Sequence, residues 1–218
     1  DVVLTEAPWH ATELASQAVA EGETRVVAAG GDGTVCEVAE GLYRAGGCEL
    51  AILPLGTGND AARTLGLPTS LEEAARVALN GGLRAVDLIE IGDHVVLNAI
   101  GVGLTGDIND RAARLKETGR LWVRGIKGYL VATLASLFQY RRRQVRMVSD
   151  GASLEVSMLM LAVHGGPTTG GGFALTPRAV PAQESSEAPA QKYRYSDDFS
   201  ADSRGQYEMS GPTQWAEG

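Results

Sequence analysis

Apolar and polar positions follow two periods along the first part of the chain. Short apolar runs of strand character lie at Arg25 to Ala29 and at Leu50 to Leu53, and the opening segment Asp1 to Thr5 also has the pattern of a strand. Apolar residues at helical spacing lie between these runs. They are Ala11, Leu14, Ala15, Ala18 and Val19, followed by Val35, Val38, Ala39 and Leu42. Strands that alternate with helices over short connections predict a parallel sheet with helices on both faces.

Two more helices are expected before the pattern changes. The first covers Ala61 to Leu65. The second begins at Ser70, has Glu73 at the capping-box spacing, and runs to Leu79 before a glycine pair at Gly81-Gly82. We therefore predict that a first domain covers residues 1–82.

Strand alternation dominates residues 83–180. A hairpin is predicted around the Gly92-Asp93 turn, and a second one joins Gln144 to Ser149 with the run Leu154 to Val163. Helical patterns are inserted between the two hairpins, from Thr105 to Lys116 and from Trp122 to Tyr140. This part is therefore expected to be mainly antiparallel β structure with inserted helices.

The last 38 residues, 181–218, have a different composition. They contain no Val, Ile or Leu, and seven acidic residues stand against three basic ones. Such a segment buries too little apolar area to offset the entropy of ordering it. It is predicted to be a disordered tail.

Charge and cysteine usage narrow the class of protein. The 27 Asp and Glu outnumber the 19 Lys and Arg, and the net charge of −8 argues against a nucleic-acid partner. Cys36 and Cys48 lack a C-x-x-C spacing, and the three histidines are scattered, so reduced cysteines and no metal-ligand set are expected. Without a leader or an apolar run of about 18 residues, a cytoplasmic location is predicted.

The clearest chemical signal is the stretch Val26 to Thr34, V-V-A-A-G-G-D-G-T, in which a strand ends in glycines and leads into a helix. Glycines allow a close backbone approach, and the amides of the following helix favour an anion, so this turn predicts a phosphate site. Asp32 would repel phosphate unless it binds a metal, orients a hydroxyl or takes a proton. Its presence therefore indicates chemistry as well as binding.

A second glycine-rich turn, P-L-G-T-G-N-D at Pro54 to Asp60, also follows a strand and precedes a helix. Two such turns at one edge of a sheet can hold a single polyphosphate. Three side chains have alternative roles. Thr57 contacts the nucleotide or caps the next helix, Glu37 holds the loop amides or is solvated, and Arg63 reaches a phosphate or lies on the surface.

Together these motifs resemble the diacylglycerol kinase catalytic domain family, in particular its soluble bacterial lipid kinases. The resemblance runs from about Thr5 to Ala179. Besides the two glycine turns, it rests on V-D-L from Val86, Asn98 with the following G-V-G-L, Lys127-Gly128-Tyr129, and G-G-G-F-A-L-T-P from Gly170 to Pro177. G-G-D-G by itself also resembles NAD kinases and phosphofructokinases, and an NAD kinase-like enzyme stays an alternative.

The resemblance implies an α/β fold: an N-terminal nucleotide-binding domain with a parallel sheet, and an incomplete antiparallel β-sandwich as the lipid-substrate domain. The implied reaction transfers the γ-phosphoryl group of ATP to a lipid alcohol such as diacylglycerol, with Mg2+. Asp32 is the catalytic candidate. The implied nucleotide-binding residues are Thr5, Gly30, Gly31, Asp32, Gly33, Thr34, Val35, Cys36, Glu37, Gly56, Thr57, Gly58, Asn59 and Asp60.

The sequence departs from the family pattern at both ends. The family begins with an N-P-x-[ST]-G turn and continues after Pro177 into an acidic D-D-G segment, which Val180 to Glu184 replaces here. The late D-G-E segment with the family's general base has no counterpart. The chain is thus interpreted as truncated at both ends, and a catalytically inactive remnant that binds nucleotide is the alternative to a lipid kinase.

The apolar helix around Tyr129 to Phe138 precedes Arg141-Arg142-Arg143. It could lie on an anionic membrane surface as a peripheral contact, or it could be a core helix with a solvated end. Both interpretations stay open at this stage, as does a homo-oligomer.

Overall fold

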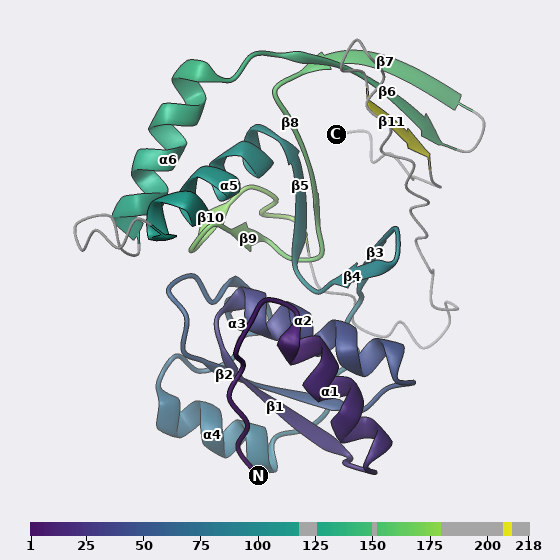
Figure 1. Ribbon diagram of the computed structural model, residues 1–218, viewed down its shortest axis with the longest axis vertical. Helices are drawn as coiled ribbons and strands as arrows, with labels where there is room; N and C mark the ends of the chain where they lie inside the picture. The colour runs from purple at the N-terminus through teal and green to yellow at the C-terminus, as the bar shows by residue number, and fades with distance from the viewer. Residues whose placement is uncertain (118–125, 150–151, 180–206, 211–218) are drawn as a thin grey trace. The chain divides into compact units, whose positions relative to one another are not determined.

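The structure is a computed structural model and describes residues 1–117, 126–149, 152–179 and 207–210 (Figure 1). The chain forms two compact units. The first contains Asp1–Ile89, His94–Ala99 and His164–Pro189, and the second contains Glu90–Asp93, Ile100–Val163 and Ala190–Gly218. The first unit therefore includes the whole of the predicted domain 1–82 and adds two later segments of the chain.

The first unit begins with alternating helices and strands, as the sequence predicts. Its parallel pair joins β1 to β2 in a register that sets Arg25 opposite Glu49 and Gly30 opposite Pro54. Both strands thus end at the same level, next to the two glycine turns. The elements are α1 (His10–Ala20), β1 (Arg25–Gly30), α2 (Asp32–Arg44), β2 (Glu49–Pro54), α3 (Asp60–Thr64) and α4 (Leu71–Asn80).

Small residues let α1 and α2 approach closely in the core of this unit. A Cβ on Gly41 would lie 2.3 Å from the Thr12 carbonyl oxygen and 2.8 Å from the Ala15 Cβ, so only glycine fits there. Beside this contact Glu40 is 2% exposed. Its carboxylate forms an ion pair with Arg44 and lies 3.0 Å from the His94 Nδ1. The buried charge is therefore paired, as burial of a carboxylate requires.

The prediction of a strand at the N-terminus is wrong. Residues 1–6 have no regular structure, and Val2 and Leu4 are 92% and 79% exposed. A strand is stabilised by pairing, and β1 is paired only with β2 among the described strands. The apolar pattern of this segment consequently carries no strand, and Thr5 is exposed.

The capping signal before α4 is confirmed. The Ser70 hydroxyl accepts a hydrogen bond from the Glu73 amide at 3.2 Å, which satisfies one of the first amides of the helix.

The later part of the chain contains the predicted hairpins in modified form. β3 (Ile89–Ile91) and β4 (His94–Val96) pair across the Gly92-Asp93 turn, and β6 (Arg143–Ser149) pairs antiparallel with β7 (Ala152–Met158). The apolar run expected as one strand from Leu154 to Val163 divides at Leu159. Its second half, β8 (Met160–His164), pairs instead with β5 (Ala99–Gly103).

This division explains why the strands do not form one continuous sheet. The Leu159 carbonyl accepts a hydrogen bond from the Leu104 amide at 2.9 Å, so the chain leaves β6 at this point and turns to β5. Two very short strands, β9 (Thr168–Thr169) and β10 (Phe173–Ala174), form a further pair in the first unit. The β-sandwich layout stays a prediction.

A helical hairpin belongs to the second unit. It consists of α5 (Leu104–Glu117) and α6 (Ile126–Gln139), close to the predicted ranges, and residues 118–125 lie outside the described part. Ala132 of α6 is 1% exposed and packs in a cluster with Leu104, Ile108 and Ala112 of α5. The two helices consequently share a small core of their own.

Most of the tail predicted to be disordered, residues 181–206 and 211–218, lies outside the described residues. Within it the structure describes β11 (Tyr207–Ser210), which pairs parallel with β6 and sets Tyr207 opposite Val145. This strand differs from the expectation of a tail without regular structure.

Candidate nucleotide-binding site

The two glycine turns of the first unit touch through their backbones. The Leu55 amide donates a hydrogen bond to the Gly30 carbonyl at 2.9 Å. A Cβ on Gly56 would lie only 2.4 Å from the Gly31 Cα, so a side chain here would force the turns apart. The structure therefore brings together the two stretches that the sequence proposes as one phosphate site.

The first turn is held from within by Thr34. A Cβ on Gly30 would lie 2.6 Å from both the Cβ and the hydroxyl oxygen of Thr34, so glycine is needed where this side chain covers the end of β1. Val35 is 2% exposed and belongs to the core. The Cys36 thiol donates to the Val95 carbonyl at 3.7 Å, and burial raises its pKa. The side chains of Val35 and Cys36 thus pack in the core or bond to the backbone, and have structural roles.

Asp32 ties the first turn to α3. Its Oδ1 accepts a hydrogen bond from the Ala61 amide at 2.9 Å, in the first turn of that helix. Its Oδ2 lies 2.8 Å from where a Cβ of Gly58 would be, so the second turn passes close to the carboxylate. One carboxylate oxygen is therefore engaged in positioning α3, and the catalytic role of Asp32 stays a prediction.

Asn59 fixes the shape of the second turn. It adopts the left-handed conformation, with φ of 52°, which asparagine tolerates better than most residues. Its side-chain oxygen accepts from the Gly56 amide and its side-chain nitrogen donates to the Gly56 carbonyl, both at 2.9 Å. Asn59 is also the residue that precedes α3, so Thr57 does not cap this helix; Thr57 is exposed.

Asp60 joins this turn to a third glycine-rich segment. It is 4% exposed, and its two oxygens accept hydrogen bonds from the Gly171 and Gly172 amides at 2.7 and 2.8 Å. Arg63 lies 3.4 Å from the same carboxylate and also donates to the Gly58 carbonyl. Arg63 is therefore part of the loop cluster as well as of the surface.

The link from Asp60 to the glycines is a role that the sequence did not give. G-G-G-F-A-L-T-P was recognised only as part of a resemblance, and Asp60 only as one member of the nucleotide set. The available signal was an acidic residue directly after a glycine-rich turn, together with a separate run of three glycines at Gly170 to Gly172. Buried carboxylates commonly accept backbone amides, and glycine amides offer the least hindrance.

A second layer of polar contacts supports this segment. The Thr64 hydroxyl donates to the Asn98 side-chain oxygen at 3.2 Å, and the Asn98 amide nitrogen donates to the Thr168 carbonyl at 3.1 Å. Nearby in sequence, burial lowers the pKa of His164, while the charge of Asp60 opposes the shift. Among the described residues, the buried His164 Nδ1 has no hydrogen-bond partner.

The start of α2 is the part of the site that is open to a ligand. Gly31 precedes the helix without a side-chain cap, and a Cβ on Gly33 would have nothing within 4 Å. The first amides of a helix have no partner within the helix and favour an anion. The Glu37 carbonyl accepts a bond from the Thr12 hydroxyl at 3.0 Å, which anchors the next turn of α2 to α1. This geometry fits a phosphate group over Gly33.

The described residues do not fit a complete magnesium site. In residues 1–117, 126–149, 152–179 and 207–210, no group of three or more His, Cys, Asp or Glu side chains is close enough to hold a metal ion. The two acidic residues of the glycine turns, Asp32 and Asp60, already accept hydrogen bonds from backbone amides with their carboxylate oxygens. These residues therefore do not form a magnesium site by themselves.

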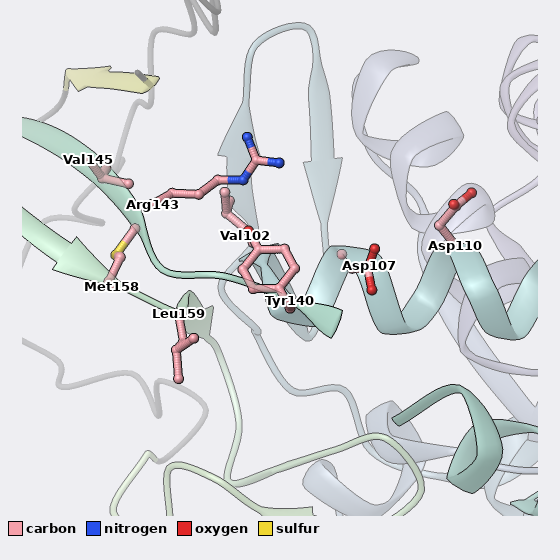
Figure 2. A pocket seen from close by; sticks show the side chains of 10 residues that line it. Val102, Asp107, Asp110, Tyr140, Arg143, Val145, Met158 and Leu159 are labelled. Carbon is pink, nitrogen blue, oxygen red and sulfur yellow. The ribbon is translucent and has the colours of Figure 1, made fainter. Parts of the chain in front are cut away.

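The second unit has a pocket of about 280 Å³ with mixed character. Figure 2 shows the Asp107 and Asp110 carboxylates on α5 at one side and Val145, Met158 and Leu159 at the other, with Tyr140 and Arg143 between them in this view. The Ser136 hydroxyl and Arg111 lower the pKa of Asp107 by hydrogen bonding to its carboxylate. The lining residues are Val102, Gly103, Gly106, Asp107, Asp110, Tyr140, Arg143, Val145, Met158 and Leu159. Such a pocket suits a ligand with one polar and one apolar end.

Solved structures define the class of this fold. The chain is similar to the crystal structure of a diacylglycerol kinase from Bacillus anthracis, with a TM-score of 0.60 and 27% identity over 83% of this chain and 55% of that one. The fold is thus the mixed α/β fold of diacylglycerol kinase structures. Residues 1–91 match the family model described as the diacylglycerol kinase catalytic domain.

Two bacterial proteins are similar in sequence to the chain. One is a Pseudomonas putida protein named "Probable lipid kinase YegS-like", 34% identical over 183 residues, which are 83% of this chain and 60% of that protein. The other is a Mycobacterium tuberculosis protein named diacylglycerol kinase, 36% identical over 176 residues, which are 78% of this chain and 55% of that protein. The chain thus spans little more than half the length of the relatives it matches.

Proposed function

We propose that this chain binds ATP at the joined glycine turns and acts in a lipid kinase, transferring the γ-phosphoryl group to a lipid hydroxyl. The observation that carries the proposal is the backbone contact between Gly31 and Gly56 beside the open first turn of α2. This arrangement offers amides to a polyphosphate from two loops. The match of residues 1–91 to the diacylglycerol kinase catalytic domain model supports ATP as the donor.

Phosphoryl transfer depends mainly on positioning and charge neutralisation. The amides at the start of α2 would hold phosphate oxygens, while Asn59 and Asp60 keep the neighbouring turn rigid. Asp32 has one oxygen bonded to the Ala61 amide, which leaves the other to orient the acceptor hydroxyl. In the reaction, the bond from the γ-phosphorus to the bridging oxygen breaks, a bond to the acceptor oxygen forms, and the hydroxyl proton is released.

The second unit is proposed as the lipid-substrate part. Its pocket combines carboxylates with Val145, Met158 and Leu159, so it suits a part of a lipid molecule that has both polar and apolar groups. The pocket is near the lower limit of ligand sites, about 300 Å³, so acyl chains would extend beyond it. Diacylglycerol is the acceptor that the names of the relatives favour.

The test is transfer of radiolabelled phosphate from ATP, with magnesium, to diacylglycerol in mixed micelles. We expect labelled phosphatidic acid, and its loss by about a hundredfold or more in Asp32→Asn, in line with the removal of an acid–base group. Glu13→Gln, an exposed carboxylate in the first turn of α1, is the matched control and should retain activity.

Other results would support different functions. Retained ATP binding without product from diacylglycerol or a sphingoid base would favour a nucleotide-binding chain without turnover. Product from NAD in place of the lipid would favour the NAD kinase-like alternative. Equal activity of Asp32→Asn and the unchanged chain would contradict the role given to Asp32.

A further inference from the structure

Helix α6 is packed with its small side chains inward and its large apolar side chains outward. Gly128, Ala132 and Ser136 are buried, and the last two are 1% and 0% exposed. The large apolar side chains of the helix are largely exposed to solvent: Leu130 57%, Val131 39%, Leu134 48%, Leu137 55% and Phe138 88%. The interpretation of α6 as an ordinary core helix therefore does not hold in this structure.

The inward face is fixed by specific contacts. Ala132 packs against the α5 cluster, and the Ser136 hydroxyl donates to the Asp107 carboxylate at 2.6 Å. Rotation of α6 to bury the leucines would break this hydrogen bond and place large side chains where small ones now fit. The outward leucines are thus a consequence of a well-defined packing.

The exposed residues form one stripe. Residues 127, 130, 131, 134, 137 and 138 follow the i, i+3, i+4, i+7 spacing of a single helix face. A contiguous exposed apolar stripe of this kind marks an interaction surface more often than an ordinary surface.

Basic residues stand at both ends of the stripe. Lys127 is exposed at its start, and Arg141 and Arg142 are exposed just after its end. Residues 126–143 contain no Asp or Glu, although the whole chain carries a net charge of −8. The stripe is therefore locally cationic in an acidic protein.

We propose that this face of α6, which we call the α6 stripe (Lys127, Leu130, Val131, Leu134, Leu137, Phe138, Arg141 and Arg142), binds the surface of an anionic lipid bilayer. Apolar side chains in the acyl boundary, with cations at the level of the phosphates, are the arrangement of interfacial helices. The helix has 14 residues and would lie in the plane of the surface. In the described part of the chain, none of the helices has the length and apolar character needed to cross a membrane.

Charge favours lipid over a second copy of the chain. If two α6 stripes paired antiparallel, Lys127 of each would face Arg141 and Arg142 of the other, and a parallel pair would bring the arginines together. Both arrangements place like charges side by side. Anionic headgroups instead complement the cations at both ends.

This inference goes beyond the proposed phosphoryl transfer because binding to a bilayer needs neither ATP nor turnover. Its test therefore uses vesicles without an acceptor lipid. The full chain is sedimented with vesicles of phosphatidylcholine containing about 30% phosphatidylserine, an anionic lipid without a free hydroxyl, and with vesicles of phosphatidylcholine alone. We expect the protein to pellet with the anionic vesicles and to bind them less at high salt, since surface charges are screened.

Two variants separate the parts of the stripe. Arg141→Gln with Arg142→Gln should weaken partitioning about 30-fold, because each basic residue near an anionic surface contributes roughly a factor of five. Leu134→Gln with Phe138→Gln should reduce binding at least as much, because both exposed side chains lose their apolar contact. Both pairs are surface changes, so circular dichroism should show an unchanged fold.

Leu71→Gln with Leu79→Gln is the matched control. These leucines are 54% and 70% exposed on α4, beside Glu72 and Glu73, so binding should be unaffected. Equal pelleting of the unchanged chain and both stripe variants would overturn the proposal. So would a dimer in light scattering that Leu134→Gln with Phe138→Gln converts to a monomer, because the stripe would then be a protein interface.

Discussion

Single carboxylates hold the glycine-rich turns in place. Asp32 bonds the Ala61 amide, and Asp60 bonds the Gly171 and Gly172 amides, so each acidic residue connects segments that are distant in the sequence. Hydrogen bonds to ionised acceptors are stronger than neutral ones, and these are at least partly shielded from water. The acidic residues of the two motifs therefore shape the site before any ligand enters.

Asp60→Asn should destabilise the first unit. Asparagine has only one side-chain oxygen, so its amide nitrogen would face one of the glycine amides and leave a buried donor without a partner. We expect a loss of about 1–3 kcal/mol in the free energy of unfolding, measured by urea denaturation. Asp110→Asn is the control, because that side chain is 57% exposed in its ion pair with Arg114 and should change stability by less than about 0.5 kcal/mol. Equal losses in the two variants would contradict the role of Asp60.

At this scale the sequence predicted residue types better than contacts. The glycines at 30, 31, 56 and 58 could be selected because strand, glycine and helix followed one another. That Gly56 meets Gly31, and that Gly58 passes Asp32, depends on the register of β1 and β2 and on loop paths. No local pattern contains that information. The role of Asp60 was missed because its partners lie more than a hundred residues away.

The packing of helix α5 against helix α6 includes a polar contact between Ser136 and Asp107. The Ser136 side chain is fully buried, and its hydroxyl donates a hydrogen bond to the Asp107 carboxylate. Arg111 donates a second hydrogen bond to the same carboxylate. The side chains of Arg111 and Asp107 are each about one-third exposed. These bonds favour the charged form of Asp107, so its folded-state pKa lies below the ordinary value of 3.8. The contribution to stability is therefore fully present above pH 3.8 and is lost as pH falls through the lower folded pKa.

Ser136→Ala should reveal this coupling. Removal of the hydroxyl should cost about 1 kcal/mol at pH 7, because a hydrogen bond to a charged group is lost inside the helical hairpin. It should also bring the pKa of Asp107 back toward 3.8, which flattens the loss of stability below that pH. Urea denaturation at pH 7, 4 and 3, with NMR titration of Asp107, measures both effects. Ser157→Ala on the exposed side of β7 is the control, and an unshifted Asp107 titration in Ser136→Ala would contradict the coupling.

Periodicity predicted the helices well and the strands less well. The starts and ends of α1, α5 and α4 follow helical spacing, glycines and a capping serine, which are local signals. The opening segment and the run around Leu159 show the opposite case, because a strand exists only where a partner is available. The faces of α6 were also undetermined, since composition does not say which side of an apolar helix packs inward.

At the scale of the molecule, the chain consists of two units, and each unit is built from segments that are separated along the sequence. The first unit also includes the later segment His164–Pro189, which contains the G-G-G sequence whose amides bond to Asp60. A linear division after residue 82 follows from a change in hydrophobic period. The return of a later segment follows from tertiary contacts, which periodicity does not report.

The proposed ATP binding requires that the open first turn of α2 holds the phosphates of the nucleotide. Gly33→Ala tests it, because the added Cβ would meet no atom within 4 Å and would only narrow the space over the helix amides. The fold should be unaffected, since alanine favours a helix. Gly82→Ala is the matched control, because its Cβ also has nothing within 4 Å. The end of α4 just before it contacts Arg25, at the opposite end of β1 from Gly30.

The measurement is ATP affinity by isothermal titration calorimetry for the unchanged chain and both variants. We predict that Gly33→Ala binds ATP about tenfold more weakly or worse, as expected when one hydrogen bond to a charged phosphate is lost, whereas Gly82→Ala binds normally. Unchanged affinity of a folded Gly33→Ala variant would show that the phosphates do not lie on α2 and would contradict the account.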